Sequence, residues 1–441
     1  MGLAMFGIPV VCILLAFAPS CTAESETDED PVELLRAVAV SLEKAEDLAP
    51  LIERAGQHEL VLLGEASHGT SEFYTLRADI SRRLVEEEGF HFIAVEGDWP
   101  TLHRLNRYVK GLDGVGPSAR RIMEGFDRWP PWMWANEEVG ELIEWLRDYN
   151  AGRSPDDRVG FHGMDVYGPE ISYRKVLAML GEWHEELAEE AEEAYACLGD
   201  FADDFTLYFH AVASGMAPCD GEVQAVVELL RDRREELAVS DREFFNLKQN
   251  AWVVKNAEKH FRAIARGGPD SWNHRVDHFF ETVERLLEYH GPAAKGVIWA
   301  HNTHIGDARA TTMAAAGERN IGQIAREQLG ADRVFSVGFG THRGTVVASR
   351  SWGEAGVLMN VPPGIPGSYE DIMHRMGEEK ILMMLEDLED AVTLLRPRWH
   401  RAIGVVYHPE HDGDQYVPTI LPQRYNAFIF VDSTEAVRPI H

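Results

Sequence analysis

The chain has 441 residues, of which 45% are hydrophobic, so it can bury a large core and is expected to fold as one big domain, with or without a sizeable insertion. Its formal net charge is −31, from 73 acidic and 42 basic residues. Such a charge repels phosphate backbones and anionic lipid headgroups, which argues against nucleic acids and membrane surfaces as partners. It favours the approach of a neutral or cationic small molecule, or it only keeps the protein soluble.

The N-terminal segment has features of an export signal. Residues 1–23 contain no charged side chain, and the stretch 5–18 is almost wholly apolar. That stretch is shorter than the roughly 20 residues that a membrane span needs. We therefore predict a signal peptide or lipoprotein signal over 1–23 and an exported protein, which contacts a membrane only if Cys21 carries a lipid anchor. Because the usual positive charge at the start is missing, the alternative is a spurious signal and a cytoplasmic protein.

An acidic spacer (24–34) and one long domain (35–441) are predicted to follow. The domain contains short apolar runs that end in small or polar residues, with segments of helical period between several of them. This alternation predicts an α/β fold, with a mostly parallel central sheet flanked by helices. The predicted strands are 60–63, 92–95, 159–161, 297–299, 334–337, 403–407 and 427–431.

The segment between about 168 and 289 has a different texture, with long stretches rich in Glu, Arg and Leu at helical spacing. We predict an α-helical insertion that forms a lid or subdomain over one side of a pocket, and a purely packing role is the alternative. Cys197 and Cys219 lie in this segment. In an exported protein they can form a disulfide, and otherwise they remain unpaired.

Reactive side chains follow four of the predicted strands. Ligands of open α/β sheets bind beyond the carboxyl ends of the strands, and the Glu65, His68, Glu96, His301 and His304 side chains are expected to lie within about 10 Å of a common centre. The reactive side chains are Glu65 and His68 after the first strand, Glu96 and Asp98 after the second, Asp165 after the third, and His301, Asn302 and His304 after the fourth.

His68 is the candidate general base, because imidazole titrates near neutrality and can take a proton from water and return it to a leaving group. Glu65 lies on the same face if both residues belong to one helix, and Glu96 is expected on an adjacent strand. Arg77, about two and a half turns along that helix, is expected to neutralise these carboxylates or to bind an oxyanion. A Gly-x-Ser-x-Gly elbow is absent from the sequence, which disfavours a covalent serine mechanism.

Seven motifs, in order over about 35–435, resemble those of the erythromycin esterase family. The chain departs from the family at Asn426, where an aspartate is common. The motifs are Gly64-Glu65-Ala66-Ser67-His68-Gly69, Glu72-Phe73-Tyr74 with Arg77, Val95-Glu96-Gly97-Asp98, Gly163-Met164-Asp165-Val166-Tyr167, Trp272-Asn273-His274-Arg275, Trp299-Ala300-His301-Asn302-Thr303-His304 and Tyr407-His408-Pro409.

The resemblance implies a hydrolase of an ester or macrolactone, in which His68 activates water and no cofactor takes part. It further implies that Glu65 and Glu96 are carboxylate partners of His68 and that Arg77 is a pocket cation. His301 and His304 are expected to form the opposite wall. The residues expected to bind substrate are Asp98, Asp165, Asn273, Arg275 and Asn302.

Two other functions fit the same residues. A divalent metal such as zinc or manganese could activate the water in a metal-dependent hydrolase, because the Glu and His side chains of the cluster are all competent ligands. The protein could also bind a small molecule without turning it over. These ligands would be Glu65, His68, Glu96, His301 and His304.

Overall fold

The computed structural model describes residues 29–388 and 390–440. The predicted signal over 1–23, Cys21 and the first part of the spacer lie outside the described residues. The predicted spacer overlaps helix α1 (Pro31–Ala37), whose N-cap Asp30 accepts a hydrogen bond from the amide of Val32 at 3.0 Å. The domain therefore includes α1, which begins before the predicted boundary at residue 35.

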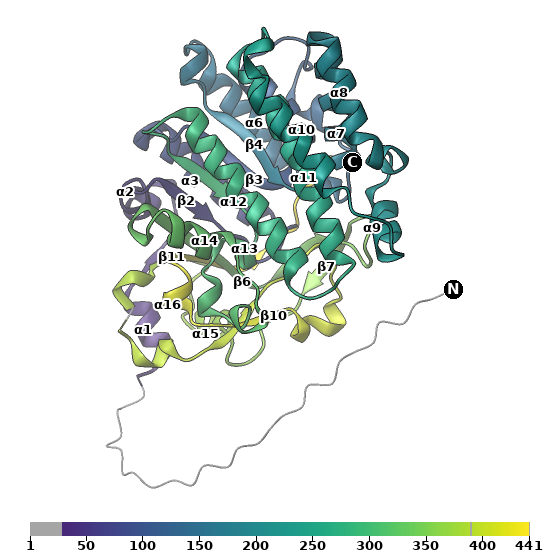
Figure 1. The fold of residues 1–441 in the computed structure, drawn as a ribbon. Coiled ribbons are helices and arrows are strands. Elements are labelled where there is room, and N and C mark those ends of the chain that lie inside the picture. Colours follow the sequence, from purple (N-terminus) through teal and green to yellow (C-terminus); the bar gives the residue numbers. More distant parts are fainter. Residues whose placement is uncertain (1–28, 389, 441) are drawn as a thin grey trace.

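The described residues contain one large sheet, with strand order β1-β8-β11-β6-β2-β5-β3-β4 and β7 paired to β6 (Figure 1). Strands β11, β6, β2, β5, β3 and β4 are parallel to one another, whereas β1, β7 and β8 join antiparallel. The predicted α/β class with a mostly parallel sheet is confirmed. The strands are β1 (Ala39–Ser41), β2 (Leu60–Leu63), β3 (Phe92–Asp98), β4 (Gly160–Asp165), β5 (Gly296–Trp299), β6 (Val334–Ala348), β7 (Val357–Val361), β8 (Lys380–Met384) and β11 (Ala427–Thr434), and β9 (Arg398–Arg401) pairs with β10 (Tyr416–Thr419) separately.

The predicted strand 403–407 is wrong. Single bridges join Ile403 to Ser67 and Val406 to Ser349, so this segment crosses the end of the sheet as a loop. Its apolar side chains are explained by packing, because Ile403 and Tyr407 are buried against β6 and β7. The other six predicted strands form the parallel core, and they are continuous apolar runs because helices cover both of their faces.

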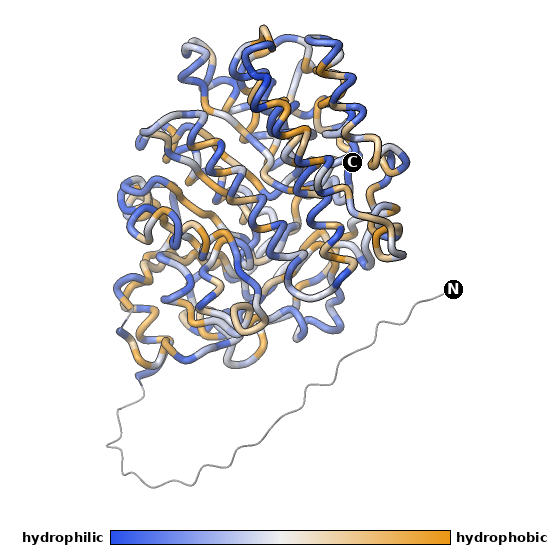
Figure 2. The backbone as a smooth tube through the Cα atoms, viewed as in Figure 1, coloured by the Kyte–Doolittle hydropathy of each residue, from blue (hydrophilic) through white to orange (hydrophobic). Residues whose placement is uncertain are grey.

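Helices cover the sheet on both sides. Helices α2 to α6 pack on one face, and α1, α12 and α14 to α16 pack on the other, where α12 and α14 lie in front of the strands in Figure 1. In Figure 2 much of the central part of the molecule is coloured as hydrophobic, whereas hydrophobic and hydrophilic residues alternate along the helices. Outside the insertion the helices are α2 (Ala49–Ala55), α3 (Ser71–Glu88), α4 (Trp99–Val109), α5 (Ala119–Met123), α6 (Glu137–Asn150), α13 (Asn302–Ile305), α14 (Ile321–Gln328), α15 (Tyr369–His374) and α16 (Leu421–Arg424).

The segment between β4 and β5 is helical and has a hydrophobic core of its own. Side chains of α7 to α11 form this core, and α12 packs back on the sheet. None of the described helices is both long and apolar enough to cross a membrane. The helices are α7 (Pro169–Trp183), α8 (Glu185–Tyr195), α9 (Phe205–Ala213), α10 (Asp220–Asp232), α11 (Asp241–Ile264) and α12 (Asp270–His290).

A disulfide joins Cys197 to Cys219 within this helical segment, with the two Cα atoms 6.1 Å apart. It closes a loop that spans 22 residues and contains α9. The question that the sequence left open is answered in favour of pairing.

We predict that replacing both cysteines, Cys197→Ser with Cys219→Ser, lowers the free energy of unfolding by about 3 kcal/mol, because the open loop gains conformational entropy in the unfolded chain. Urea denaturation followed by circular dichroism measures the change. Reducing agent should destabilise the wild type and leave the double variant unaffected. Equal midpoints for both proteins under oxidising conditions would contradict the prediction.

Candidate active site

The carboxyl ends of β2, β5 and β3 bring three of the predicted residues together. Strand β5 lies between the other two. The expectation that β2 and β3 are adjacent strands is therefore wrong. His301 follows β5 and therefore lies between Glu65 and Glu96, rather than across the pocket from them. Its amide donates a hydrogen bond to Glu96 Oε2 at 2.9 Å, and its ring centroid is 4.9 Å from that of His68.

His68 lies in a turn rather than in a helix, since α3 begins at Ser71. The turn still brings His68 Nδ1 to 2.8 Å from Glu65 Oε1, and the Tyr74 hydroxyl donates to the carbonyl of His68 at 2.7 Å. Glycine is required at Gly69, because a Cβ there would lie 1.9 Å from the carbonyl oxygen of Val347 in β6. The close approach to β6 therefore fixes the turn that presents His68.

Arg77 forms a buried ion pair with Glu65. Its Nη2 donates to Glu65 Oε2 at 2.6 Å, and both side chains are completely buried. The guanidinium carbon lies 4.6 Å from the ring centroids of both Tyr74 and Trp299. Of its two predicted roles, Arg77 therefore fits the neutralising one, because a cation enclosed by two aromatic rings cannot reach an oxyanion in the cavity.

Arg275 of α12 binds the second group of carboxylates. Its Nε and Nη2 donate to both oxygens of Asp165, at 3.0 and 2.6 Å, and Nη2 also donates to Glu96 Oε1 at 2.9 Å. His304 Nε2 lies 3.3 Å from both Arg275 Nη1 and Glu96 Oε1, and its ring stacks on Trp272. The helical segment thus contributes to the site through α12.

A cavity of about 120 Å³ opens beside these residues. Four predicted residues line it: His68, Glu96, Asp165 and Arg275. We call it the carboxyl-edge cavity. The sequence reasoning missed its other walls, which are Arg128, Trp129, Pro130, Met133, Tyr167, Trp352 and Val405.

The missed residues differ in the signal that could have found them. Tyr167 ends one of the family-like motifs, and its ring lies 4.5 Å from the Arg128 guanidinium carbon. Trp129 and Trp352 are more than 200 residues apart in sequence, yet their ring centroids are 4.4 Å apart at the rim. Loops carry both tryptophans, so no period or strand end in the sequence marks them.

Three residues predicted to bind substrate have other contacts. Asp98 caps α4 by accepting from the Thr101 amide at 3.0 Å, and it lines a separate small cavity. Asn273 binds the loop at 317–319 through the Gly317 carbonyl and the Arg319 amide. Asn302 is fully buried and bonds both backbone groups of Phe339 in β6. None of these three side chains lines the carboxyl-edge cavity, because helix caps, loops and strands use their polar atoms.

The family departure at Asn426 also has a structural role. Its Oδ1 accepts from Arg326 at 2.9 Å and from the Ser336 amide, and its Nδ2 donates to Glu386 at 3.0 Å. Asn426 therefore supports the sheet away from the cavity.

Charges around His68 favour its protonated form. Burial lowers the pKa of His68, but the hydrogen bond to Glu65 and the charges of Glu96 and Glu65 outweigh it, and the pKa is raised above its ordinary value of 6.5. Burial raises the pKa of Glu96, but His304, His68 and Arg275 overcome it and hold the carboxyl well below its usual range. Glu96 is therefore a carboxylate at neutral pH.

His301 is kept neutral, because burial and then the charge of His68 lower its pKa well below 6.5. Its Nδ1 contacts Thr303, 2.8 Å from Oγ1 and 3.3 Å from the amide nitrogen, and its other ring nitrogen is Nε2. Among the described residues that Nε2 has no hydrogen-bond partner. The ring beside His68 therefore has one buried nitrogen that no other described residue contacts by a hydrogen bond.

Three side chains could hold a metal ion. Ligand atoms of Glu65, His68 and Glu96 lie within 4.8 Å of one another. All four carboxylate oxygens of this group already accept hydrogen bonds, from His68, Arg77, Arg275 and the amide of His301. A metal would share these oxygens with the present donors, because each carboxylate oxygen has a second lone pair.

Comparison with known proteins identifies relatives. The family model described as erythromycin esterase matches residues 85–434. The erythromycin esterase type II of Escherichia coli is 29% identical over 121 residues, and the match spans 27% of this chain and only 26% of that protein. The site residues before the matched range are Glu65, His68 and Arg77.

Solved structures share the fold. A protein from Bacillus cereus has a TM-score of 0.79 at 22% identity, covering 93% of this chain and 98% of its own. A succinoglycan biosynthesis protein has a TM-score of 0.77 at 21% identity, covering 94% and 100%. A variant of the erythromycin esterase EreC in its open conformation has a TM-score of 0.63 at 15% identity, covering 89% and 94%.

We predict that Arg77→Met lowers the free energy of unfolding by about 3–5 kcal/mol, because it leaves the Glu65 carboxylate buried without its cation. Adding Glu65→Gln to Arg77→Met should recover part of this loss. Arg83→Met, on the exposed side of the same helix, is the control and should cost no more than about 1 kcal/mol. Urea titration measures these variants, Glu65→Gln alone and the wild type, and additive losses in the double variant would contradict the coupling.

Proposed function

Since this chain belongs to the erythromycin esterase family, we propose that it is a hydrolase of the esterase type in which His68 activates a water molecule. One observation carries the proposal. His68 donates its Nδ1–H to the Glu65 carboxylate, which leaves Nε2 as a proton acceptor on a side chain that lines the carboxyl-edge cavity. Among the described residues, nothing is hydrogen-bonded to that Nε2.

The proposed reaction is direct hydrolysis. His68 takes a proton from water as the oxygen attacks the carbonyl carbon, and the resulting imidazolium is stabilised by Glu65 and Glu96. His68 then returns the proton to the departing alkoxide, so that one ester and one water give an acid and an alcohol.

The cavity supports an ester or lactone as the substrate class. Its volume of about 120 Å³ accommodates the reacting acyl group, and a larger alcohol or lactone ring would extend past Trp129 and Trp352. Trp352 is 67% exposed, so its ring is available to contact the outer part of such a substrate. Macrolactones are included in the proposal because the related esterases are named for erythromycin.

A metal-dependent hydrolase is the second candidate, because Glu65, His68 and Glu96 converge closely enough to bind zinc or manganese. We rank it below the metal-free reaction. The positive charges of Arg77 and Arg275 already compensate the two carboxylates, and the His68–Glu65 hydrogen bond uses one of the ligand pairs.

We predict that His68→Ala and His68→Asn lower kcat by about 10²- to 10⁴-fold and leave the fold intact, because a positioned general base typically contributes that factor. The assay follows product formation from a panel of simple esters and macrolides by mass spectrometry. His210→Asn, an exposed histidine on α9, is the control and should keep the wild-type rate.

The same assay separates the alternatives. Chelation should leave the wild-type rate unchanged in the metal-free reaction. Activity that is lost on chelation and restored by zinc or manganese would establish the metal-dependent one. A His68→Ala enzyme that turns over substrate at the wild-type rate would refute both, and tight binding without turnover in the wild type would indicate a binding protein.

We predict that kcat rises with pH and that the midpoint of this ascending limb of the pH profile lies above pH 6.5. His68 works as a base only when deprotonated, and the carboxylates raise its pKa, so the limb is shifted to higher pH. Glu65→Gln removes the hydrogen-bonded charge, and its limb should move to lower pH while kcat falls. Glu53→Gln, an exposed position on α2, should leave the limb in place. A limb that is the same in Glu65→Gln and wild type would disprove the assignment.

A further inference from the structure

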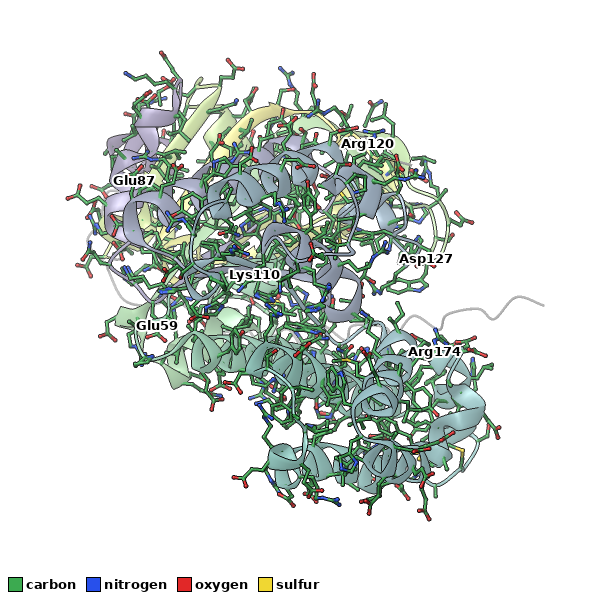
Figure 3. All side chains as sticks on the ribbon, turned by 90° about the horizontal axis from the view of Figure 1, so that it is seen from above. Glu59, Glu87, Lys110, Arg120, Asp127 and Arg174 are labelled. Atoms are coloured by element: carbon green, nitrogen blue, oxygen red, sulfur yellow. A yellow bond between two sulfur atoms is a disulfide. The ribbon has the colours of Figure 1, made fainter. Side chains whose placement is uncertain are left out.

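A second cavity, of about 540 Å³, lies at the opposite edge of the sheet. Residues just before β3 and β4, including Phe90 and Val159, line it together with Tyr289 and His290 at the end of α12. Lys110, which follows α4, lines it as well. We call it the amino-edge cavity. Figure 3 shows Lys110 in this region, between the helices that cover the sheet and those of the helical segment.

Lys110 is a buried cation without a partner. The residue is only 8% exposed, and among the described residues no hydrogen bond or ion pair reaches its amine. Its carbonyl, by contrast, accepts from Arg158. The amine is not among the fully buried unpaired atoms of the described residues, so it keeps contact with solvent-accessible space in which a ligand can pair with it.

The cavity lining carries both signs of charge, because Lys110, Arg153 and Arg158 are basic and three other residues are acidic. Of the cavity's three acidic residues, Asp241 pairs with Arg234 and has a 93% exposed side chain, while Asp157 accepts from Ser154 and is exposed. Only Asp156 of these raises the pKa of Lys110. Burial lowers that pKa to about 8, and the Arg242 and Arg158 charges act in the same direction.

Nearby buried histidines also lack acceptors. Both ring nitrogens of His162, Nδ1 of His103 and Nε2 of His290 have no hydrogen-bond partner among the described residues. The charge of Lys110 lowers the pKa of both His162 and His290. The groups that face Lys110 are thus Asp156 and Arg158 from the 155–158 turn, Arg242 from α11, His290 from α12, His162 from β4 and His103 from α4.

We propose that the amino-edge cavity is a second ligand site, which binds a small anion with a phosphate or carboxylate group on an aromatic body. The anionic group pairs with Lys110, and the partly exposed Tyr149 and Tyr289, which line the same cavity, provide the surface for the aromatic body. This site is independent of the proposed hydrolysis, because it lies at the amino ends of the strands.

Calorimetric titration of the full-length protein tests the proposal. Phenyl phosphate, benzoate and neutral phenol are the probes at pH 7. Both anions should bind at least about tenfold more tightly than phenol, since each gains a charge-assisted hydrogen bond. Whichever anion binds more tightly identifies the preferred group. Absence of saturable binding for both anions, or equal affinity for phenol, would overturn the proposal.

Variants locate the binding. Lys110→Met should lower the affinity for the more tightly bound anion by about tenfold or more. Lys259 is an exposed lysine on α11, and Lys259→Met should have no effect. Affinity in the wild type should fall as pH rises above about 8, because the amine of Lys110 loses its charge, and Lys110→Met should lack this dependence. Equal binding by Lys110→Met and wild type would place the anion elsewhere.

A labelling experiment on the unaltered protein covers the case in which Lys110→Met fails to fold. Trinitrobenzenesulfonate modifies neutral amines, and peptide mapping by mass spectrometry gives the extent at each lysine. The tighter anion should protect Lys110 from modification and leave Lys259 unprotected. Equal modification of Lys110 with and without the anion would refute the proposal.

Discussion

The buried carboxylate of Glu65 is the constraint on which the candidate site depends. A carboxylate without solvent must be hydrogen-bonded and charge-compensated, and Arg77 does this at one oxygen. The second oxygen is then free to accept the Nδ1–H of His68, which fixes the tautomer and orientation of the ring. Tyr74 and Trp299 hold Arg77 in place from either side, so the packing of α3 against β5 determines how His68 is presented.

The strand order extends this arrangement to the other half of the site. Because β5 lies between β2 and β3, the amide of His301 reaches Glu96 while its ring contacts His68. Glu96 and Asp165 in turn share Arg275. The positive charges of Arg77 and Arg275 compensate two of the three carboxylates, which are Glu65, Glu96 and Asp165. A proton on His68 compensates the third negative charge. At the opposite edge of the sheet the buried charge of Lys110 is left without such compensation.

Much of the fold and part of the site could be predicted from the sequence. Helices on both faces require continuous apolar strands, and six of the seven predicted runs are strands of the parallel core. Parallel strands also open on one edge, which is why Glu65, His68, Glu96, His301 and His304 could be grouped in advance. Sequence failed at 403–407, because a loop buried against β6 and β7 has the same apolar composition as a strand.

The sequence by itself determined which side chains stand at the strand ends, since hydrophobic periodicity marks where each strand stops. Only the tertiary structure decided how they are used. Strand order placed His301 between the two glutamates, and long-range hydrogen bonds assigned Asn302 to β6 and Asn273 to the loop at 317–319. Arg77 is fully buried, whereas Arg275 lines the carboxyl-edge cavity. Folding of the chain also brought Trp129 into contact with Trp352. These outcomes depend on contacts between residues far apart in the chain, which local patterns do not encode.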